Sequence, residues 1–306
     1  MHQDNNTPQA VLEAVPQAVL ELEPGSRPDE WHQHANGGGW VYREARVAPT
    51  AFVAPNAAVF GKAQVLDYAQ VLDHARVAGT ACVRDHARVA GQAVVDGRAE
   101  VSDHAVVAGK ARVAGNAEVR DRGEVRDHAV VEGVAVKIAG SARVGGKARV
   151  ADHARVGDNA RVAGRAAVYG HAMVYGDARV GGRAWIGQDA EVFGHAEVSG
   201  VAGISDYAKV FGRARVAGNA RVAGAAFVAG RARIGGYAEV NGDAWVAGRA
   251  RVDDAAWVGG SAVVDTEPVC TGASVSVGPP TLDTATRVEE QPASSRALEV
   301  ASASTP

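Results

Sequence analysis

Residues 214–225 read Ala-Arg-Val-Ala-Gly-Asn-Ala-Arg-Val-Ala-Gly-Ala, which is two copies of one six-residue word. The word, Ala-x-Val-x-(Gly/Asp)-x, repeats from Ala45 to Val264 with a single break in its step. Its large aliphatic residue falls at 37 positions, all Val or Ile, and at 35 of these Ala stands two residues earlier. So strict a period predicts a solenoid, in which each repeat packs on its neighbours and all share one core.

The word has the composition of a very short strand followed by a turn. Its Ala and Val are two residues apart, so in an extended segment they point to the same side. Two residues after the aliphatic, 23 of the 37 positions are Gly and 10 are Asp, which suit turns. A three-sided tube with 18 residues per coil fits a core of Ala and Val, because a wider tube would leave voids. We therefore expect an all-β, single-stranded parallel β-helix shaped as a triangular prism, with about 12 coils roughly 4.8 Å apart.

The sequence resembles a known superfamily at two places. Val-Ala-Gly-Asn-Ala at residues 113–117 and 216–220 is similar to the hexapeptide repeat of left-handed β-helix proteins, many of which are CoA-dependent acyltransferases. Residues 38–41, Gly-Gly-Trp-Val, resemble the lead-in of the bacterial YdcK-like branch, which is described as acetyltransferase-like and is common in phage-derived regions. The resemblance covers roughly residues 37–265. It implies a left-handed coil, a homotrimer, and acetyl-CoA or another acyl-CoA as substrate, with no separate cofactor.

Three segments are expected along the chain. Residues 1–36, rich in Pro and acidic residues, read as a flexible N-terminal lead-in with a cap near Trp31–Trp40. Residues 37–267 form the β-helix, and residues 268–306, rich in Pro, Ser and Thr, read as a disordered tail that can hold a packed stub at Thr271–Val277. The break at residues 133–136 inserts one residue and predicts a bulge at one corner. Acyltransferases of the resembled superfamily usually hold their active site with a long inserted loop, and the repeat contains none.

Composition limits the classes of function. The formal net charge of −3 favours neither nucleic acid nor an anionic membrane as partner of the whole chain. No apolar run approaches the roughly 18 residues of a membrane span, and no basic segment precedes an apolar stretch at the N-terminus. Cys82 and Cys270 are too few for a disulfide framework or a zinc site. A cytoplasmic location with no membrane partner is expected.

Histidines are the candidate catalytic residues. Seven of them follow the Gly or Asp of a corner, and five of these come directly after Asp. If the acyltransferase interpretation holds, a corner histidine serves as the general base, and His86, His104 and His195 are the candidates because they share one corner. The alternative is that they are polar corner residues of a repeated template. Histidines stacked in neighbouring coils could share a metal, but a third ligand is not evident, so no metal site is expected.

The outward residues of one face form a cationic row. Past the insertion, its arginines recur every 18 residues with one glutamate, Glu197, among them, and small residues stand beside them. The arginines of this row, called the Arg ladder below, are Arg143, Arg161, Arg179, Arg215, Arg233 and Arg251. Stacked like charges repel one another, and an anionic polymer would relieve that repulsion. The alternative is a solvated face produced by duplication of an Arg-bearing repeat.

A second face carries large apolar residues. These are Met173, Tyr175, Phe193, Phe211, Phe227 and Trp245, called the aromatic strip below. An apolar row along a prism needs a cover, so the strip predicts self-association, with a trimer favoured by the resemblance. Packing of the C-terminal segment across the strip is the alternative.

Two functions are left by the sequence. The favoured one is a non-catalytic β-solenoid scaffold or binding protein that acts through its flat faces, the Arg ladder and the aromatic strip. The alternative is a CoA-dependent acyltransferase with its active site between subunits, which rests on fold resemblance alone. An ice-binding prism is set aside because its flat face would need ranks of Thr where this chain carries Arg.

Overall fold

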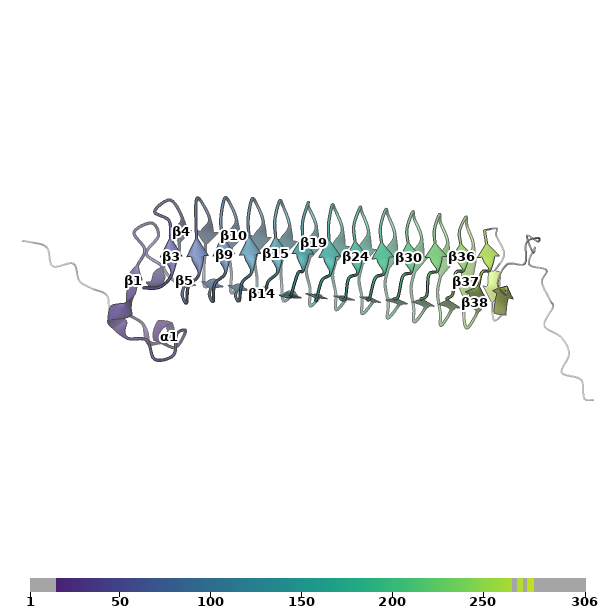
Figure 1. Cartoon of the computed structure of the whole chain (residues 1–306), viewed down its shortest axis with the longest axis horizontal. Helices are drawn as coiled ribbons and strands as arrows, with labels where there is room; N and C mark the ends of the chain where they lie inside the picture. The colour runs from purple at the N-terminus through teal and green to yellow at the C-terminus, as the bar shows by residue number, and fades with distance from the viewer. Residues whose placement is uncertain (1–14, 266–268, 272–273, 278–306) are drawn as a thin grey trace, which may run out of the picture.

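The computed structural model describes residues 15–265, 269–271 and 274–277, and it is a three-sided parallel β-solenoid of about 12 turns (Figure 1). Three long sheets form the sides of the prism, and consecutive strands along the chain fall on sheets B, C and A in turn. The expected all-β solenoid with three strands per coil is therefore confirmed. The corners between these sheets are called the B–C, C–A and A–B edges below.

Most strands are only two residues long, and the strands of each sheet follow one another in space in the order of the chain. Sheet A contains β1 (Trp31–Gln33), β2 (Trp40–Tyr42), β5 (Ala58–Val59), β8 (Arg76–Val77), β11 (Val94–Val95), β14 (Arg112–Gly115), β17 (Val130–Gly133), β20 (Arg149–Ala151), β23 (Ala167–Val168), β26 (Trp185–Ile186), β29 (Gly203–Ile204), β32 (Arg221–Val222), β35 (Glu239–Val240), β38 (Trp257–Gly260) and β41 (Ser274–Val277). Sheet B contains β3 (Arg46–Val47), β6 (Gln64–Val65), β9 (Cys82–Val83), β12 (Glu100–Val101), β15 (Glu118–Val119), β18 (Lys137–Ile138), β21 (Arg155–Val156), β24 (Met173–Val174), β27 (Glu191–Val192), β30 (Lys209–Val210), β33 (Phe227–Val228), β36 (Trp245–Val246) and β39 (Val263–Val264). Sheet C contains β4 (Phe52–Val53), β7 (Gln70–Val71), β10 (Arg88–Val89), β13 (Val106–Val107), β16 (Glu124–Val125), β19 (Arg143–Val144), β22 (Arg161–Val162), β25 (Arg179–Val180), β28 (Glu197–Val198), β31 (Arg215–Val216), β34 (Arg233–Ile234), β37 (Arg251–Asp253) and β40 (Val269–Thr271).

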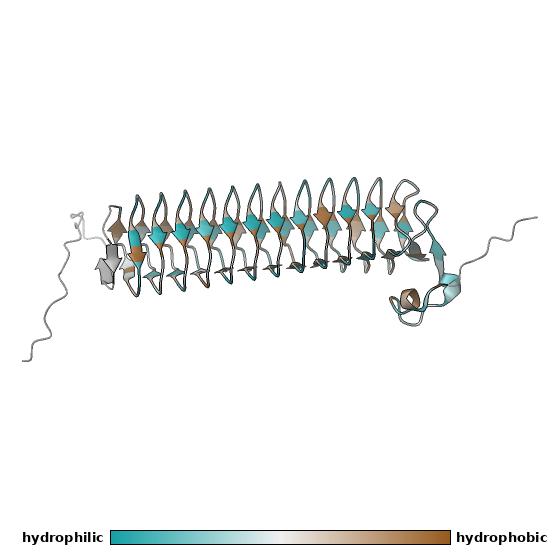
Figure 2. Cartoon of the chain, turned by 180° about the vertical axis from the view of Figure 1, so that it is seen from behind, coloured by the Kyte–Doolittle hydropathy of each residue, from teal (hydrophilic) through white to brown (hydrophobic). Residues whose placement is uncertain are grey.

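The core is the aliphatic half of the repeat. In β22, for example, Val162 and the preceding Ala160 are fully buried, whereas Arg161 between them is exposed. The same alternation colours the strands in Figure 2, where hydrophilic and hydrophobic residues adjoin within single arrows. Ala, Val and four Ile fill the tube, because each strand places one small and one large aliphatic side chain inside.

The corners use left-handed backbone. All ten corner Asp residues, together with Gln188, have positive φ, as do the corner glycines except Gly133. Neighbouring corners also approach closely, since a Cβ added at Gly79 would lie 2.7 Å from the carbonyl oxygen of Gly97 in the next coil. Gly and Asp are therefore at the corners because the backbone there needs residues that tolerate this conformation.

The inserted residue is accommodated at one corner on the A–B edge. There β17 extends to Gly133, and Val134 protrudes with 63% of its surface exposed. The register has recovered by β18, where Lys137 pairs with Glu118 and Ile138 with Val119. The expected bulge is confirmed, and the core is continuous on both sides of it.

The N-terminal end of the tube is closed by non-repetitive structure. Within the expected lead-in, the chain forms α1 (Gln17–Leu20), which begins directly after Pro16, then η1 (Pro28–Glu30) and β1. Strand β1 pairs antiparallel with β2, and the hairpin between them lies over the first coil, where the Gly39 amide donates to the Val53 carbonyl at 2.9 Å. The cap expected near Trp31–Trp40 is this hairpin, and it covers an edge that would otherwise be open.

At the other end, β40 and β41 continue sheets C and A into the segment expected as a disordered tail. The rest of that tail lies outside the described residues. In the described part of the chain, no helix has the length and apolar character that crossing a bilayer requires.

Candidate functional surfaces

The three candidate histidines lie on the B–C edge, but they do not form one site. His86 and His104 occupy neighbouring coils, and their ring centroids are 5.2 Å apart. Tyr68 stacks on the other side of His86, with 5.5 Å between centroids. His195 follows β27, whereas His104 follows β12, and β15, β18, β21 and β24 intervene in sheet B. The structure thus brings two of the three together and places the third far along the prism.

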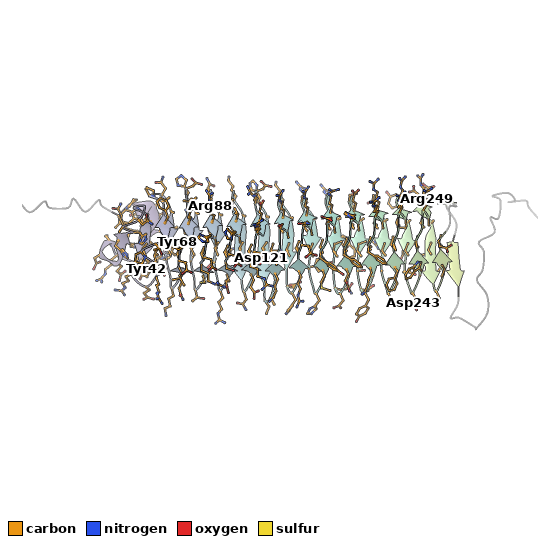
Figure 3. All side chains as sticks on the ribbon, turned by 90° about the horizontal axis from the view of Figure 1, so that it is seen from above. Tyr42, Tyr68, Arg88, Asp121, Asp243 and Arg249 are labelled. Carbon is orange, nitrogen blue, oxygen red and sulfur yellow. The ribbon has the colours of Figure 1, made fainter. Side chains whose placement is uncertain are left out.

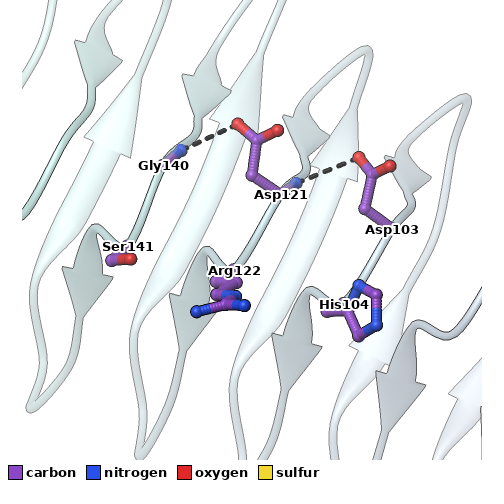
Figure 4. Close-up of a pocket in the computed structure, with 6 residues that line it drawn as sticks. All are labelled: Asp103, His104, Asp121, Arg122, Gly140 and Ser141. Atoms are coloured by element: carbon purple, nitrogen blue, oxygen red, sulfur yellow. Dashed lines mark hydrogen bonds between the residues drawn. The ribbon is translucent and has the colours of Figure 1, made fainter.

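The aspartates beside these histidines are occupied by the backbone. The Asp103 carboxylate accepts a hydrogen bond from the Asp121 amide at 3.1 Å, and the Asp121 carboxylate accepts one from the Gly140 amide at 2.8 Å (Figure 4). Among the described residues, no hydrogen bond joins the His104 ring to either carboxylate. A catalytic imidazole needs such an orienting partner, and here the carboxylates serve the corner instead.

A shallow hollow of about 440 Å³ lies over this part of the edge. Its lining residues are Asp103, His104, Asp121, Arg122, Gly140 and Ser141. The hollow contains the residue types of a Ser-His-Asp triad, but Arg122 stands in the coil between His104 and Ser141. Two coils separate these side chains by roughly 10 Å, well beyond the hydrogen bond that activates a serine. The hollow therefore lacks the contacts of a nucleophilic site.

His195 does have an acidic neighbour. Its Nδ1 atom lies 3.5 Å from an Asp177 carboxylate oxygen, and both side chains are at least half exposed. On the A–B edge, His153 and His171 stack with 4.6 Å between centroids. No group of three His, Cys, Asp or Glu side chains within the described ranges is placed to hold a metal ion.

The Arg ladder occupies sheet C in the expected register. Arg161 pairs with Arg143 and Arg179 in the neighbouring strands, and Arg233 pairs with Arg215 and Arg251. The small residues Gly145, Ala163, Gly181, Ser199, Ala217 and Gly235 follow the strands of this row. The face is therefore flat and open, and the side chains stand off the coils in long rows (Figure 3).

Acidic residues neutralise part of the ladder. Glu197 lies 3.3 Å from the Arg179 guanidinium and 3.1 Å from that of Arg215. It therefore bridges the three ladder arginines that precede it and the three that follow it, called the first and second halves of the ladder below. Glu124 lies 3.6 Å from the Arg143 guanidinium at one end. At the other end, Asp253 pairs with Arg251 at 2.8 Å, and hydrogen bonds from Arg251 and the Asp254 amide lower the pKa of the Asp253 carboxyl.

The central arginine of each half, Arg161 or Arg233, forms no ion pair with any residue in the described segments. Arg161 also lines a second hollow, of about 190 Å³. The residues around that hollow are Ser141, Arg143, Asn159, Arg161, Asp177 and Arg179. These two arginines are therefore the ladder residues most available to an external anion.

Cations also line the edges of sheet C, which the sequence interpretation missed. Beside the first half of the ladder, the C–A edge carries Lys147, Arg165 and Arg183. Beside the second half, the B–C edge carries Arg213, Arg231 and Arg249. The sequence does contain a signal for these cations. In the first half, an Arg or Lys stands four residues after each ladder arginine; in the second half, an Arg stands two residues before each one. Only the assignment of corners to edges shows that these cations adjoin the ladder.

The aromatic strip consists of two rows on and beside sheet B. Tyr175, Phe193 and Phe211 lie at the B–C end of successive strands, and their rings stack in parallel with 4.9 Å between neighbouring centroids. Met173, Phe227 and Trp245 point outward from β24, β33 and β36, and the last two stack at 5.2 Å. Of the six, Trp245 is the most open to solvent, with 41% of its surface exposed, and the other five are partly buried. The rings thus bury much of their surface against one another.

Tyr175 has a hydroxyl partner within the strip. Its hydroxyl donates to a Glu191 carboxylate oxygen at 3.0 Å. Burial, together with this hydrogen bond and the charge of Glu191, raises the pKa of Tyr175 to about 12. The phenol is therefore held in its neutral form.

Comparison with known proteins adds no assignment to these surfaces. The chain matches no family model and no curated protein.

Proposed function

We propose that this protein is a non-catalytic β-solenoid scaffold that binds an anionic polymer through sheet C. The observation that carries the proposal is the Arg ladder on a flat face, with Arg161 and Arg233 lacking an acidic partner among the described residues. Guanidinium groups in such a row are recognition elements for carboxylate, sulfate or phosphate groups, which they bind through paired N–H donors.

The charge of the molecule is segregated in support of this proposal. From β19 to β37, the outward residues of sheet C and its two edges carry 12 cations against five acids, Asp158, Asp177, Glu197, Asp253 and Asp254. This region therefore has a formal charge of +7, whereas the whole chain has −3, which leaves −10 for the remainder. The imbalance gives sheet C a local positive field. A face that is only solvated does not require such a concentration of positive charge.

A binding experiment with a generic linear polyanion tests the proposal. In calorimetric titrations with polyacrylate at low salt, we expect the double variant Arg161→Gln/Arg233→Gln to bind roughly tenfold more weakly than wild type. The matched control is Arg155→Gln/Arg221→Gln, because these arginines are also exposed and point outward, from sheets B and A. Equal binding by both double variants, or no binding by wild type, would contradict the proposal.

The competing proposal is a CoA-dependent acyltransferase with its active site between subunits. The observation in its favour is the hollow on the B–C edge that His104 lines, with His86 stacked on His104 outside it. Titration with acetyl-CoA at millimolar concentration tests the enzyme, because no heat would reject it. Heat that is lost in Arg161→Gln/Arg233→Gln but kept in His104→Ala would come from the phosphates of CoA on the Arg ladder and would not support the enzyme. Binding that is lost in His104→Ala would favour the acyltransferase.

We further propose that the scaffold is a homotrimer assembled through the aromatic strip. Trp245 supports this because a large aromatic side chain is 41% exposed at the end of an otherwise self-stacked row. Trp245→Ser should shift the sedimentation-equilibrium mass toward the monomer. Tyr237→Ser, on the C–A edge and 73% exposed, should leave that mass unchanged. A wild-type mass equal to that of one chain would reject the assembly.

A further inference from the structure

We infer that the polymer bound by sheet C is a linear acidic polysaccharide that runs along the solenoid and crosses the face obliquely. This inference rests on the proposed function and specifies the class of ligand. It is drawn from the shape of the cationic surface, the chemistry of its edges and the position of Glu197.

The cations form two offset groups. In the first, the ladder residues of β19, β22 and β25 adjoin cations on the C–A edge; in the second, those of β31, β34 and β37 adjoin cations on the B–C edge. Glu197 lies between the groups and contacts both. A chain that follows the positive charge therefore enters near the C–A edge, passes Glu197 and leaves near the B–C edge. Coils about 4.8 Å apart repeat the guanidinium groups along this path.

The surface requires an extended ligand. Small residues beside the ladder leave little wall to enclose a compact molecule, and the hollow at Arg161 is small, at about 190 Å³. An affinity of useful strength must then come from many weak ion pairs in sequence, each worth little on an exposed surface. A linear polymer with an acid on each unit, or on alternate units, supplies them.

The outward face of sheet C itself lacks the features that bind nucleic acid bases; the exposed Tyr237 stands on the C–A edge, on the opposite side of the sheet from the edge cations of the second group. Between β19 and β37, the outward residues of sheet C and those that follow each strand are Arg, Glu, Gly, Ala, Ser and Asp, with no aromatic side chain. Single-stranded nucleic acids bind proteins largely through bases stacked on aromatic rings. A duplex presents its phosphates on a helical path, which a straight ladder meets only where the backbone crosses it. The chemistry of the face therefore disfavours nucleic acid.

Instead, the cations are interleaved with small neutral polar groups. Ser141 and Asn159 stand on the B–C edge next to the first group, and Ser199 and Asn219 lie on or beside the C–A edge. Hydroxyl and amide groups exchange hydrogen bonds with sugar hydroxyls as both donors and acceptors. Eleven of the 12 cations are Arg, the residue whose planar fork matches carboxylate and sulfate. This combination fits a polymer of acidic sugars.

Four probes test the inference in low-salt biolayer interferometry: polygalacturonate, dextran sulfate, neutral dextran and a short oligothymidylate. We expect both acidic polysaccharides to bind more tightly than the oligonucleotide, and neutral dextran not to bind. Arg161→Gln/Arg233→Gln should weaken polysaccharide binding at least roughly tenfold, whereas Arg155→Gln/Arg221→Gln should leave it unchanged. Glu197→Gln should strengthen it severalfold, because it releases Arg179 and Arg215 from their shared acid. Circular dichroism of each variant verifies that these exposed substitutions leave the fold intact.

The outcomes separate the inference from the proposed function. Tighter, ladder-dependent binding of oligothymidylate overturns the polysaccharide inference and leaves the anion-binding scaffold standing. Polysaccharide binding that Arg161→Gln/Arg233→Gln does not change places the ligand elsewhere and overturns the inference. If neither the acidic polysaccharides nor polyacrylate bind, the proposed function fails together with the polysaccharide inference.

Discussion

At the scale of single residues, the corner aspartates show how one position can tie successive coils together. Asp67, Asp85, Asp103 and Asp121 succeed one another on the B–C edge, and each carboxylate accepts the amide of the corresponding residue one coil later. The same bond recurs from Asp73, Asp127, Asp152, Asp158 and Asp206 on the three edges. Asp thus stabilises a corner that Gly only permits.

Substitution of Asp103 separates its two contributions. Asp103→Ala keeps a Cβ at positive φ but loses the acceptor, so we expect it to lower the free energy of unfolding by about 1–2 kcal/mol. Asp103→Gly relieves the backbone and Asp103→Asn keeps an acceptor, so each should stay within about 0.5 kcal/mol of wild type. Urea unfolding measures the differences. Asp243→Ala is the control, because Asp243 occupies the second position of its corner, after Gly242, where φ is not positive. A cost there equal to that of Asp103→Ala would refute the argument.

Tyr175 predicts a specific pH dependence. Because its folded pKa of about 12 lies above the ordinary value of 10, the folded state holds the phenolic proton more tightly than the unfolded state. The resulting stabilisation is complete below pH 10 and is lost as the pH rises toward 12. In ultraviolet titration, the difference between wild type and Tyr175→Phe should have its midpoint near pH 12. A midpoint near pH 10 would mean that Glu191 and burial have no effect on the phenol.

At the scale of strands, elements of only two residues form because each one pairs with the strands one coil before and after it. The sequence predicted these strands well, since the small residue and the large aliphatic keep their two-residue spacing throughout and 33 of the 37 corners are Gly or Asp. It predicted the N-terminal cap less fully. There Trp31, Trp40 and Tyr42 pack with Val15 and Val19 in a cluster that has no period to reveal it. Local propensity alone does not specify such a contact.

Gly203, at an outward position on sheet A, depends on the side chain beside it in the neighbouring strand. A Cβ built on Gly203 would overlap the Trp185 indole, which lies across it from the adjoining strand β26. Gly203→Ala should therefore displace the indole, cost about 1 kcal/mol and shift the Trp185 fluorescence to longer wavelength. In a Trp185→Ala background the same substitution should be neutral or slightly stabilising, since Ala suits a strand better than Gly. Equal costs in both backgrounds would show that the indole is not the obstacle.

At the scale of the whole molecule, the repeat of 18 residues turns a sequence pattern into flat faces. The ladder and the strip could be predicted because sorting outward residues by this period needs only the coil length. The ion pairs at Glu197 and the stacking of His86 on His104 depend on side-chain conformation, which the period does not specify. His195 shares a corner with His86 in the sequence pattern, but five strands of sheet B lie between β9 and β27, so the two histidines do not share a site.

Deletions measure whether this period governs both stability and binding. Removal of residues 211–228 takes out one full coil, so every remaining strand keeps its sheet and the melting temperature should stay within about 5 °C of wild type. Removal of residues 211–216 alone also keeps Ala and Val inside, but it moves each later strand to the preceding side, so that β32 passes from sheet A to sheet C.

The binding surface distinguishes the two deletions. In the hexad deletion, sheet C continues after Glu197 with the outward residues Arg221, Glu239 and Trp257 in place of Arg215, Arg233 and Arg251. The second half of the ladder is thereby lost while the core is retained. We expect polyacrylate binding roughly tenfold weaker than that of the full-coil deletion, which removes Arg215 alone from the ladder. If both deletions unfold the protein equally, the three-sided register is wrong; if both fold and bind alike, the ladder is not the binding surface.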